Sequence, residues 1–249
     1  MLRALLALAL MLSGLAVGLA PTSGAATSHP CVQANELWFR AGDGAKLVGH
    51  RFGGAKPGRK TAVVLAHMSE GDLCVWAPYA RRLAAKGFWV FPFDFRGHGF
   101  SEGRRDHAKA VADFAAAVRA ARGLGARKVV IGGASLGGIA AIIAAPRLRP
   151  AVQGVVSVSG PAAITGELNA RPAAPRLRVP TLYVVAEQDQ NGPYDFAAEA
   201  QELYDATGTS EKRLELVPGA LHGTFLVQGS ARVRTVLERF FRGPAAAVP

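Results

Sequence analysis

The sequence is poor in the residues that most often hold metal ions or cofactors. It has only two cysteines and six histidines in 249 residues, and the histidines are scattered along the chain. These residues do not show the spacing of a structural or catalytic metal site. No Gly-x-Gly-x-x-Gly motif follows the first predicted strand, which argues against a dinucleotide cofactor. We therefore expect neither a metal nor a cofactor.

Acidic side chains are also scarce. The chain has 18 Asp and Glu against 29 Lys and Arg, which gives a formal charge of +11. Such a balance is compatible with nucleic acid or with anionic envelope polymers. However, the basic residues are dispersed in small groups, and no stretch interleaves them with aromatic side chains that could stack on bases. We expect no nucleic-acid partner and interpret the charge as solvated surface, with weak association with an anionic cell envelope as the alternative.

The N-terminus has the composition of an export signal. Its first 20 residues carry Arg3 as their only charge, and a short run of small residues follows. This pattern is typical of a secretory signal peptide cleaved near Ala25 or Ala26. An uncleaved membrane anchor is the alternative, because the apolar run is close to the length of a short transmembrane helix. Both interpretations place the folded part outside the cytoplasm.

The length and composition of the rest fit one domain. Half of the residues are hydrophobic, which is enough for a full core, and no internal repeat is visible. We predict a signal peptide over residues 1–26 and one folded domain over residues 27–249. In an oxidising compartment an even pair of cysteines is a candidate disulfide, so we predict a bridge between Cys31 and Cys74. Two buried thiols are the alternative.

The most informative stretch runs from Val129 to Gly138. A β-branched apolar run ends in glycines around Ser135, and small residues suited to a helix follow. This is the Gly-x-Ser-x-Gly pattern of a strand, a sharp turn and a helix. Side chains at Gly133 and Gly137 would collide where the strand and the helix cross, and the strained turn would present the serine hydroxyl to a partner base.

Predicted strands and helices alternate from Thr61 onward, after an opening antiparallel hairpin. The order predicts an α/β fold with a mainly parallel sheet of about eight strands and helices on both faces. Besides the strand before Ser135, the expected strands are 36–40, 46–51, 61–66, 88–93, 152–159, 180–186 and 213–217. The expected helices are 77–86, 106–122, 136–145, 196–206 and 231–241.

Two polar residues that follow later strands can activate the serine. A serine hydroxyl is a weak nucleophile, so it needs a base within hydrogen-bond reach and a carboxylate that orients the base. Asp189 comes just after one predicted strand, and His222 comes just after the last one. Functional sites in such sheets lie beyond the carboxyl ends of the strands, where Ser135 also lies. The chain order is therefore Ser, Asp, His.

This order and several motifs resemble the α/β-hydrolase superfamily. Besides the Gly-x-Ser-x-Gly turn at Ser135, the resemblance rests on Asp-x-Arg-Gly-His-Gly-x-Ser at 94–101, Ala-Glu-Gln-Asp at 186–189 and Pro-Gly-x-x-His-Gly at 218–223. It covers residues 36–241. It implies that Ser135 is the nucleophile, His222 the general base and then acid, and Asp189 the orienting carboxylate.

The resemblance also implies an oxyanion hole. One donor is the backbone N–H of Leu136, the residue after the nucleophile, and the other comes from the loop after the third strand. Members of the family often have His-Gly in that loop, whereas this chain has Met68 after the histidine. Either Met68 or Ser69 is then the second donor.

Other polar residues near these motifs have competing interpretations. His67 and His98 are expected to hold loops by hydrogen bonds, and Asp94 is expected to stabilise a turn. Four residues are rival acids for the histidine: Glu187, Asp195, Glu70 and Asp72.

The segment from Gly160 to Val179 is short and rich in proline, so it predicts a minimal lid, an open cleft and little apolar wall.

The expected function is a secreted serine hydrolase, a carboxylesterase that acts on small-molecule esters with short or medium acyl groups through an acyl-serine intermediate. The alternatives are a peptidase, amidase or acyltransferase of the same fold, or a non-catalytic protein that binds the cell envelope.

Overall fold

The computed structural model describes residues 28–32, 36–54 and 61–248. The predicted signal peptide over residues 1–26 lies outside these ranges. Within them, no helix combines the length and the apolar character that crossing a membrane requires.

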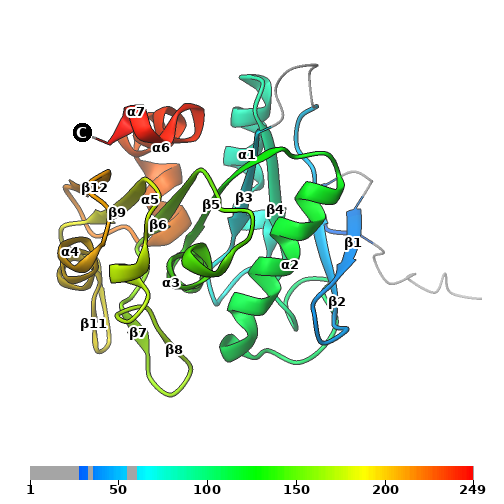
Figure 1. Ribbon diagram of the computed structural model, residues 1–249, viewed down its shortest axis with the longest axis horizontal. Coiled ribbons are helices and arrows are strands. Elements are labelled where there is room, and N and C mark those ends of the chain that lie inside the picture. Colours follow the sequence, from blue (N-terminus) through cyan, green and yellow to red (C-terminus); the bar gives the residue numbers. More distant parts are fainter. Residues whose placement is uncertain (1–27, 33–35, 55–60, 249) are drawn as a thin grey trace, which may run out of the picture.

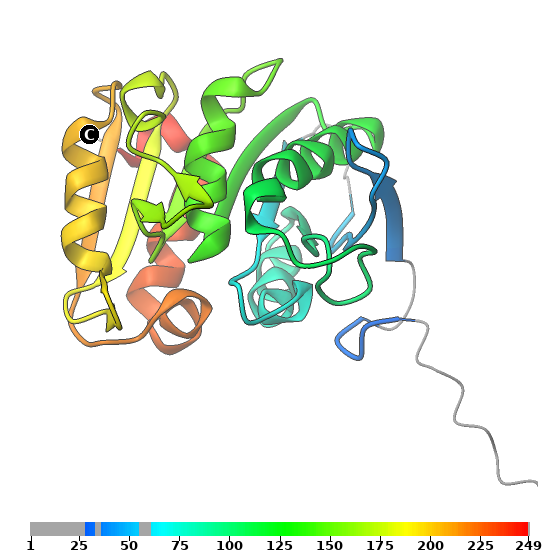
Figure 2. The same cartoon turned by 90° about the horizontal axis from the view of Figure 1, so that it is seen from below.

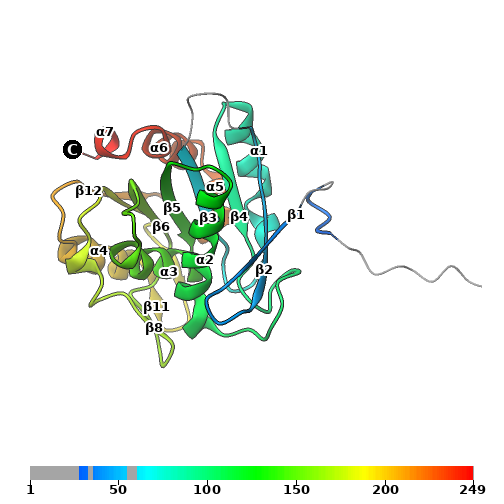
Figure 3. The same ribbon diagram turned by 45° about the vertical axis from the view of Figure 1, so that its right-hand side comes forward.

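An eight-stranded sheet organises the molecule, in the order β1-β2-β4-β3-β5-β6-β9-β12 (Figure 1). The first two strands form an antiparallel hairpin, and the strands from β3 onward pair in parallel. The hairpin lies at one edge of the sheet and β12 at the other (Figure 3). The strands are β1 (Glu36–Arg40), β2 (Lys46–His50), β3 (Thr61–Ala66), β4 (Trp89–Phe93), β5 (Lys128–Ala134), β6 (Gly154–Val158), β9 (Thr181–Ala186) and β12 (Lys212–Val217).

Helices cover both faces of this sheet (Figure 2). One face carries α1 (Ala77–Ala85), α5 (Gly223–Gly229) and α6 (Ala231–Arg242), with the short α7 (Pro244–Ala247) after it. The other face carries α2 (Ala110–Gly123), α3 (Leu136–Ala144) and α4 (Phe196–Ala206). In the part of the chain that the structure describes, four 3-10 helices accompany them: η1 (Leu73–Val75), η2 (His107–Lys109), η3 (Ala145–Arg147) and η4 (Ala174–Arg176). The predicted fold is therefore confirmed.

Apolar patterning explains this layering. The central strands are buried on both faces, as their continuous apolar sequences require. All nine residues of α3 are buried, and they are either apolar or glycine. In contrast, α6 buries one face and exposes Arg232, Arg239 and Arg242, because its apolar residues recur at helical spacing.

The structure adds elements that the sequence did not predict. Two small hairpins follow strands of the sheet: β7 (Ala163–Ile164) with β8 (Leu168–Asn169), and β10 (Gln190–Asn191) with β11 (Tyr194–Asp195). Strands of two residues are too short to show a hydrophobic period, so no sequence pattern marks them. The first hairpin and η4 make up the 160–179 segment, in agreement with the minimal lid that was predicted.

Candidate active site

Ser135 lies in the strained turn that the sequence predicts. Its backbone has φ 51° and ψ −115°, and its N–H donates to the Val158 carbonyl at 2.9 Å. A Cβ on Gly133 would overlap the backbone of Gly137, and a Cβ on Gly137 would overlap the carbonyl of Ala66. Only glycine fits at these two positions, because the start of α3 lies so close to β5 at Gly133 and to the end of β3 at Gly137.

Asp189 and His222 contact each other beyond the ends of β9 and β12. The Nδ1 atom of His222 lies 2.9 Å from Oδ1 and 3.1 Å from Oδ2 of Asp189. Asp189 is almost fully buried, and the imidazole is partly exposed. Because an ionised carboxylate only accepts hydrogen bonds, Nδ1 carries the hydrogen, and Nε2 is left as a proton acceptor.

The serine and the histidine line the same cavity, which has a volume of about 320 Å³. Leu136, Met68 and Ser69, the expected oxyanion residues, line it as well. Leu136 is the first residue of α3, so its N–H has no acceptor within the helix. The cavity can therefore offer a nucleophile, a base and a backbone donor to one substrate.

The wall of this cavity is more apolar than the sequence predicted. Little apolar wall was expected because that prediction was based only on the 160–179 segment. This segment supplies Pro161 and Ile164 to the cavity lining. The larger side chains come from the turn after β9 and from α5. They are Tyr194, Phe196 and Phe225.

The rival acids have other partners. Asp195 accepts the Ala198 N–H at 3.0 Å and so caps α4, while Glu187 is exposed. Glu70 lies at the cavity and faces Arg105 at 3.7 Å. Asp72 accepts the Cys74 N–H at 2.8 Å and caps η1. Among the acidic residues for which the structure gives a position, Asp189 is the one that contacts His222.

Two further residues hold the histidine, and the sequence analysis missed both. Ser159 is buried with φ 51°, and its hydroxyl accepts the Gly223 N–H at 3.0 Å. The ring of Phe196 lies 4.4 Å from the His222 ring, centroid to centroid. Only the place of Ser159, directly after β6, hinted at a role. Phe196 follows the unpredicted β10–β11 hairpin, and its N–H donates to the Asp189 carbonyl at 3.0 Å.

Met68 occupies the place where the resembling family often has glycine, and its packing explains the exchange. The Met68 side chain is buried, and its sulfur lies 3.6 Å from the Thr224 hydroxyl, at the start of α5. A Cβ on Gly223 would come within 2.5 Å of that sulfur. Met68 therefore fills the space beneath the segment that carries His222.

The other histidines of the motifs support the loops. His67 is fully buried; its Nδ1–H donates to the Met68 carbonyl at 2.6 Å, and its Nε2 accepts the Phe95 N–H at 3.0 Å. Burial lowers the pKa of His67 to about 3, so the ring stays neutral. His98 lies 3.0 Å from the Gly71 carbonyl. These contacts fit the structural roles that were expected.

Covalent and polar contacts hold the N-terminal segment beside η1, the 3-10 helix that follows β3. The structure joins Cys31 and Cys74 by a disulfide. His29 is buried between Glu36, which contacts Nδ1, and Asp94, whose Oδ2 lies 2.8 Å from Nε2. Burial alone would lower the pKa of His29, but the hydrogen bonds with Asp94 and Glu36 and the charges of Asp94 and Asp72 outweigh it and raise the pKa to about 9.

Among the described residues, one cluster has the composition of a metal site: His29, Asp72 and Asp94. Their potential ligand atoms lie within 4.8 Å of one another. The same atoms already have partners in the chain. Asp94 accepts the Leu73 N–H at 2.7 Å and the Phe100 N–H at 3.1 Å, in addition to its contact with His29. We therefore assign this cluster to the fastening of the N-terminal segment.

Comparisons with known proteins agree with the fold. A family model described as serine aminopeptidase, S33, matches residues 57–174. No curated protein matches the chain. Among solved structures, the esterase Pf2001 of Pyrococcus furiosus is 18% identical with a TM-score of 0.69, over 84% of this chain and 91% of that one.

Two further solved structures are similar at the level of the fold. The enol-lactonase of Burkholderia xenovorans is 18% identical with a TM-score of 0.66, over 83% of this chain and all of that one (100%). An esterase of Exiguobacterium antarcticum is 15% identical with a TM-score of 0.67, over 84% of this chain and 100% of that one. Over the matched part of this chain, these solved structures share its fold.

Proposed function

This chain belongs to the α/β-hydrolase superfamily, and on that premise we propose that it is a serine hydrolase that cleaves carboxylic esters with short or medium acyl groups. The observation that carries the proposal is the Asp189–His222 hydrogen bond beside the cavity that Ser135 lines. The three residues are the nucleophile, base and orienting acid that acyl transfer to a serine requires.

In the proposed reaction, Nε2 of His222 takes the hydroxyl proton of Ser135 while Oγ attacks the carbonyl carbon of the ester. The tetrahedral intermediate collapses when the carbon–oxygen bond to the alcohol breaks, and His222 returns the proton to the leaving alcohol. Water then attacks the acyl-serine with His222 again as the base. The acid leaves, and Ser135 regains its proton.

The negative charge that develops on the carbonyl oxygen requires donors. We assign the Leu136 N–H as one donor, together with Met68 or Ser69 from the facing loop, since all three residues line the cavity. The N-terminal end of α3 adds a favourable dipole at the same place. His222 becomes an imidazolium in this step, and the buried Asp189 carboxylate stabilises it.

A peptidase is the second candidate, because the matching family model is described as a serine aminopeptidase. An aminopeptidase needs an anionic group that binds the free amino end of its substrate. Glu70 is the acid at the cavity, but its side chain is 85% exposed and faces Arg105. The apolar wall favours an uncharged ester instead.

The disulfide supports export of the protein, since such bridges persist in oxidising compartments. We therefore place the enzyme outside the cytoplasm, as a secreted or anchored protein.

The substrate class is tested by comparing p-nitrophenyl butyrate with leucine p-nitroanilide, at equal concentrations of purified protein. The proposal expects kcat/KM for the ester to exceed that for the anilide by at least about 100-fold. A higher kcat/KM for the anilide would contradict the esterase and support the peptidase. The Ser135→Ala variant is the control for adventitious hydrolysis.

A further inference from the structure

A side-chain contact ties the β7–β8 hairpin to η2, which contributes to the cavity wall. Nδ1 of His107 lies 2.7 Å from Oε2 of Glu167. His107 belongs to η2, directly before α2, and it lines the cavity. Glu167 lies in the turn of the hairpin and does not line the cavity. The contact therefore joins two segments that are 60 residues apart in the chain.

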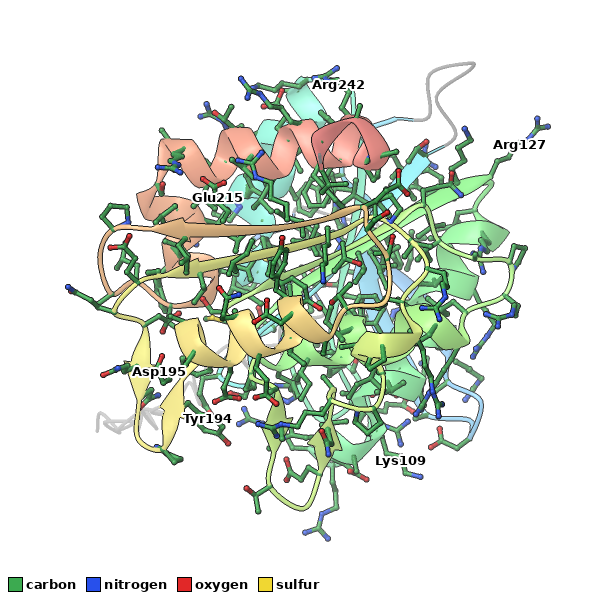
Figure 4. The ribbon with its side chains drawn as sticks, turned by 60° about the vertical axis from the view of Figure 1, so that its left-hand side comes forward. Lys109, Arg127, Tyr194, Asp195, Glu215 and Arg242 are labelled. Atoms are coloured by element: carbon green, nitrogen blue, oxygen red, sulfur yellow. A yellow bond between two sulfur atoms is a disulfide. The ribbon has the colours of Figure 1, made fainter. Side chains whose placement is uncertain are left out.

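The hairpin lies between β11 and η2, which both supply residues to the cavity lining (Figure 4). Figure 4 shows it with Tyr194 of β11 on one side and Lys109, the last residue of η2, on the other. Figure 1 shows the same order of β11, β7, β8 and the start of α2. Ile164 of β7 contributes to the lining. The hairpin thus reaches toward η2 from the side of the cavity that carries Tyr194.

The base of the hairpin is firmly held, whereas its tip is not. At the base, Leu168 is buried, the Ala170 N–H donates to the Ala162 carbonyl at 2.8 Å, and the Ala162 N–H donates to Glu199 at 2.6 Å. Residues 165–167 at the tip are exposed. Within the described ranges, the contact with His107 is the one side-chain hydrogen bond that the tip makes.

We propose that the contact between His107 and Glu167 closes one end of the cavity and limits the length of the ester chain that the enzyme accepts. This inference rests on the proposed esterase function and adds a pair of specificity-determining residues to it. With the contact in place, the tip cannot move away from η2, and a longer chain meets His107. When the contact is absent, the tip can move away from η2, and the cavity accepts the longer chain.

Glu167 offers the sharper test of the two residues. A change at His107 also alters the cavity lining, whereas a change at Glu167 alters only the contact. Glu167→Ala removes the acceptor, and Glu167→Gln keeps an amide oxygen that accepts from His107. The matched control is Glu238→Ala, which removes the partner of Lys86 and Arg242 on the α6 face of the sheet.

The experiment measures kcat/KM for two pairs of substrates: p-nitrophenyl butyrate and octanoate, which vary the acyl chain, and butyl and octyl acetate, which vary the alcohol. Each buried methylene is worth about fourfold in kcat/KM. We expect Glu167→Ala to raise the ratio of long to short substrate by about fourfold or more in one pair. We expect Glu167→Gln and Glu238→Ala to keep the wild-type ratios.

Two results would overturn the inference. One is a ratio for Glu167→Ala within about twofold of wild type in both pairs. The other is a Glu167→Gln variant that behaves like Glu167→Ala, since the hydrogen bond would then not be what closes the cavity. Failure of the esterase proposal looks different: the wild-type protein would hydrolyse none of the four esters.

Discussion

The hydroxyl of Ser159 accepts the backbone N–H of Gly223 at 3.0 Å, which fixes the residue after His222 to the end of β6. Ser159 itself has a positive φ of 51°, a conformation that costs free energy in a residue with a side chain. The side chain of Ser159, directly after β6, therefore holds the segment of the candidate base, and β6 carries none of the three proposed catalytic residues.

Ser159→Ala is expected to lower kcat by about 10- to 100-fold with little change in KM, because a small displacement of His222 weakens proton transfer. Ser157→Ala is the matched control. Its hydroxyl is also buried near the end of β6, but it has no hydrogen-bond partner among the described residues. Steady-state kinetics on p-nitrophenyl butyrate measure both variants. Equal kcat values would contradict the positioning role of Ser159.

Asp189→Asn is expected to lower kcat by about 1,000- to 10,000-fold, because an amide does not select the required tautomer of His222 or stabilise its charged form. The comparison variant is Asp195→Asn, at the rival acid that caps α4. We expect its kcat to stay near that of wild type. A larger loss in Asp195→Asn than in Asp189→Asn would reassign the orienting acid.

His29 should make the stability of the protein depend on pH. Its pKa is raised to about 9 in the folded state, above the ordinary value of 6.5. The protonated ring therefore stabilises the fold fully below about pH 6.5, and this contribution is lost as the pH rises through 9.

Thermal unfolding at pH 6 and at pH 9.5 measures this contribution. We expect Tm to fall by several degrees over this range, at about 2–4 °C per kcal/mol for a chain of this size. Because other groups also titrate, the decisive quantity is the difference from His29→Gln, whose Tm should fall less. A parallel fall in both proteins would show that His29 does not contribute.

The disulfide should contribute strongly to stability. Cys31 and Cys74 are 43 residues apart, and closing a loop of this length restricts the unfolded chain by about 4 kcal/mol. Reduction, or replacement of both cysteines by serine, is expected to lower the free energy of unfolding accordingly in urea titrations. A double variant as stable as the oxidised protein would refute this contribution.

The sequence was informative wherever chemistry forces a residue type at a fixed place. Gly133 and Gly137 had to be glycine because two backbones touch there, and Asp189 with His222 had to follow strands to reach Ser135. These positions carry a local pattern, and the fold follows from the alternation of buried strands with helices.

The parts that could not be predicted depend on contacts between distant segments. Ser159, Phe196 and His107 reach the site from a strand end, a hairpin and a 3-10 turn, and nothing local distinguishes them from other serines, phenylalanines and histidines. The prediction of little apolar wall was wrong for the same reason. Tyr194 and Phe225 come to the cavity from elements outside the segment on which that prediction was based.

We propose Ser135 as the nucleophile, and covalent labelling is a direct test of this role. Folded wild-type protein and the Ser135→Ala variant are treated with a fluorophosphonate, and the adduct is located by peptide mass spectrometry. Heat-denatured wild-type protein is the control for reactivity that does not need the site. We expect one adduct, on Ser135 of the folded wild-type protein, and none in the variant or the denatured sample. Labelling of Ser135→Ala to the same extent, or an adduct on a different residue of the wild-type protein, would contradict this proposal.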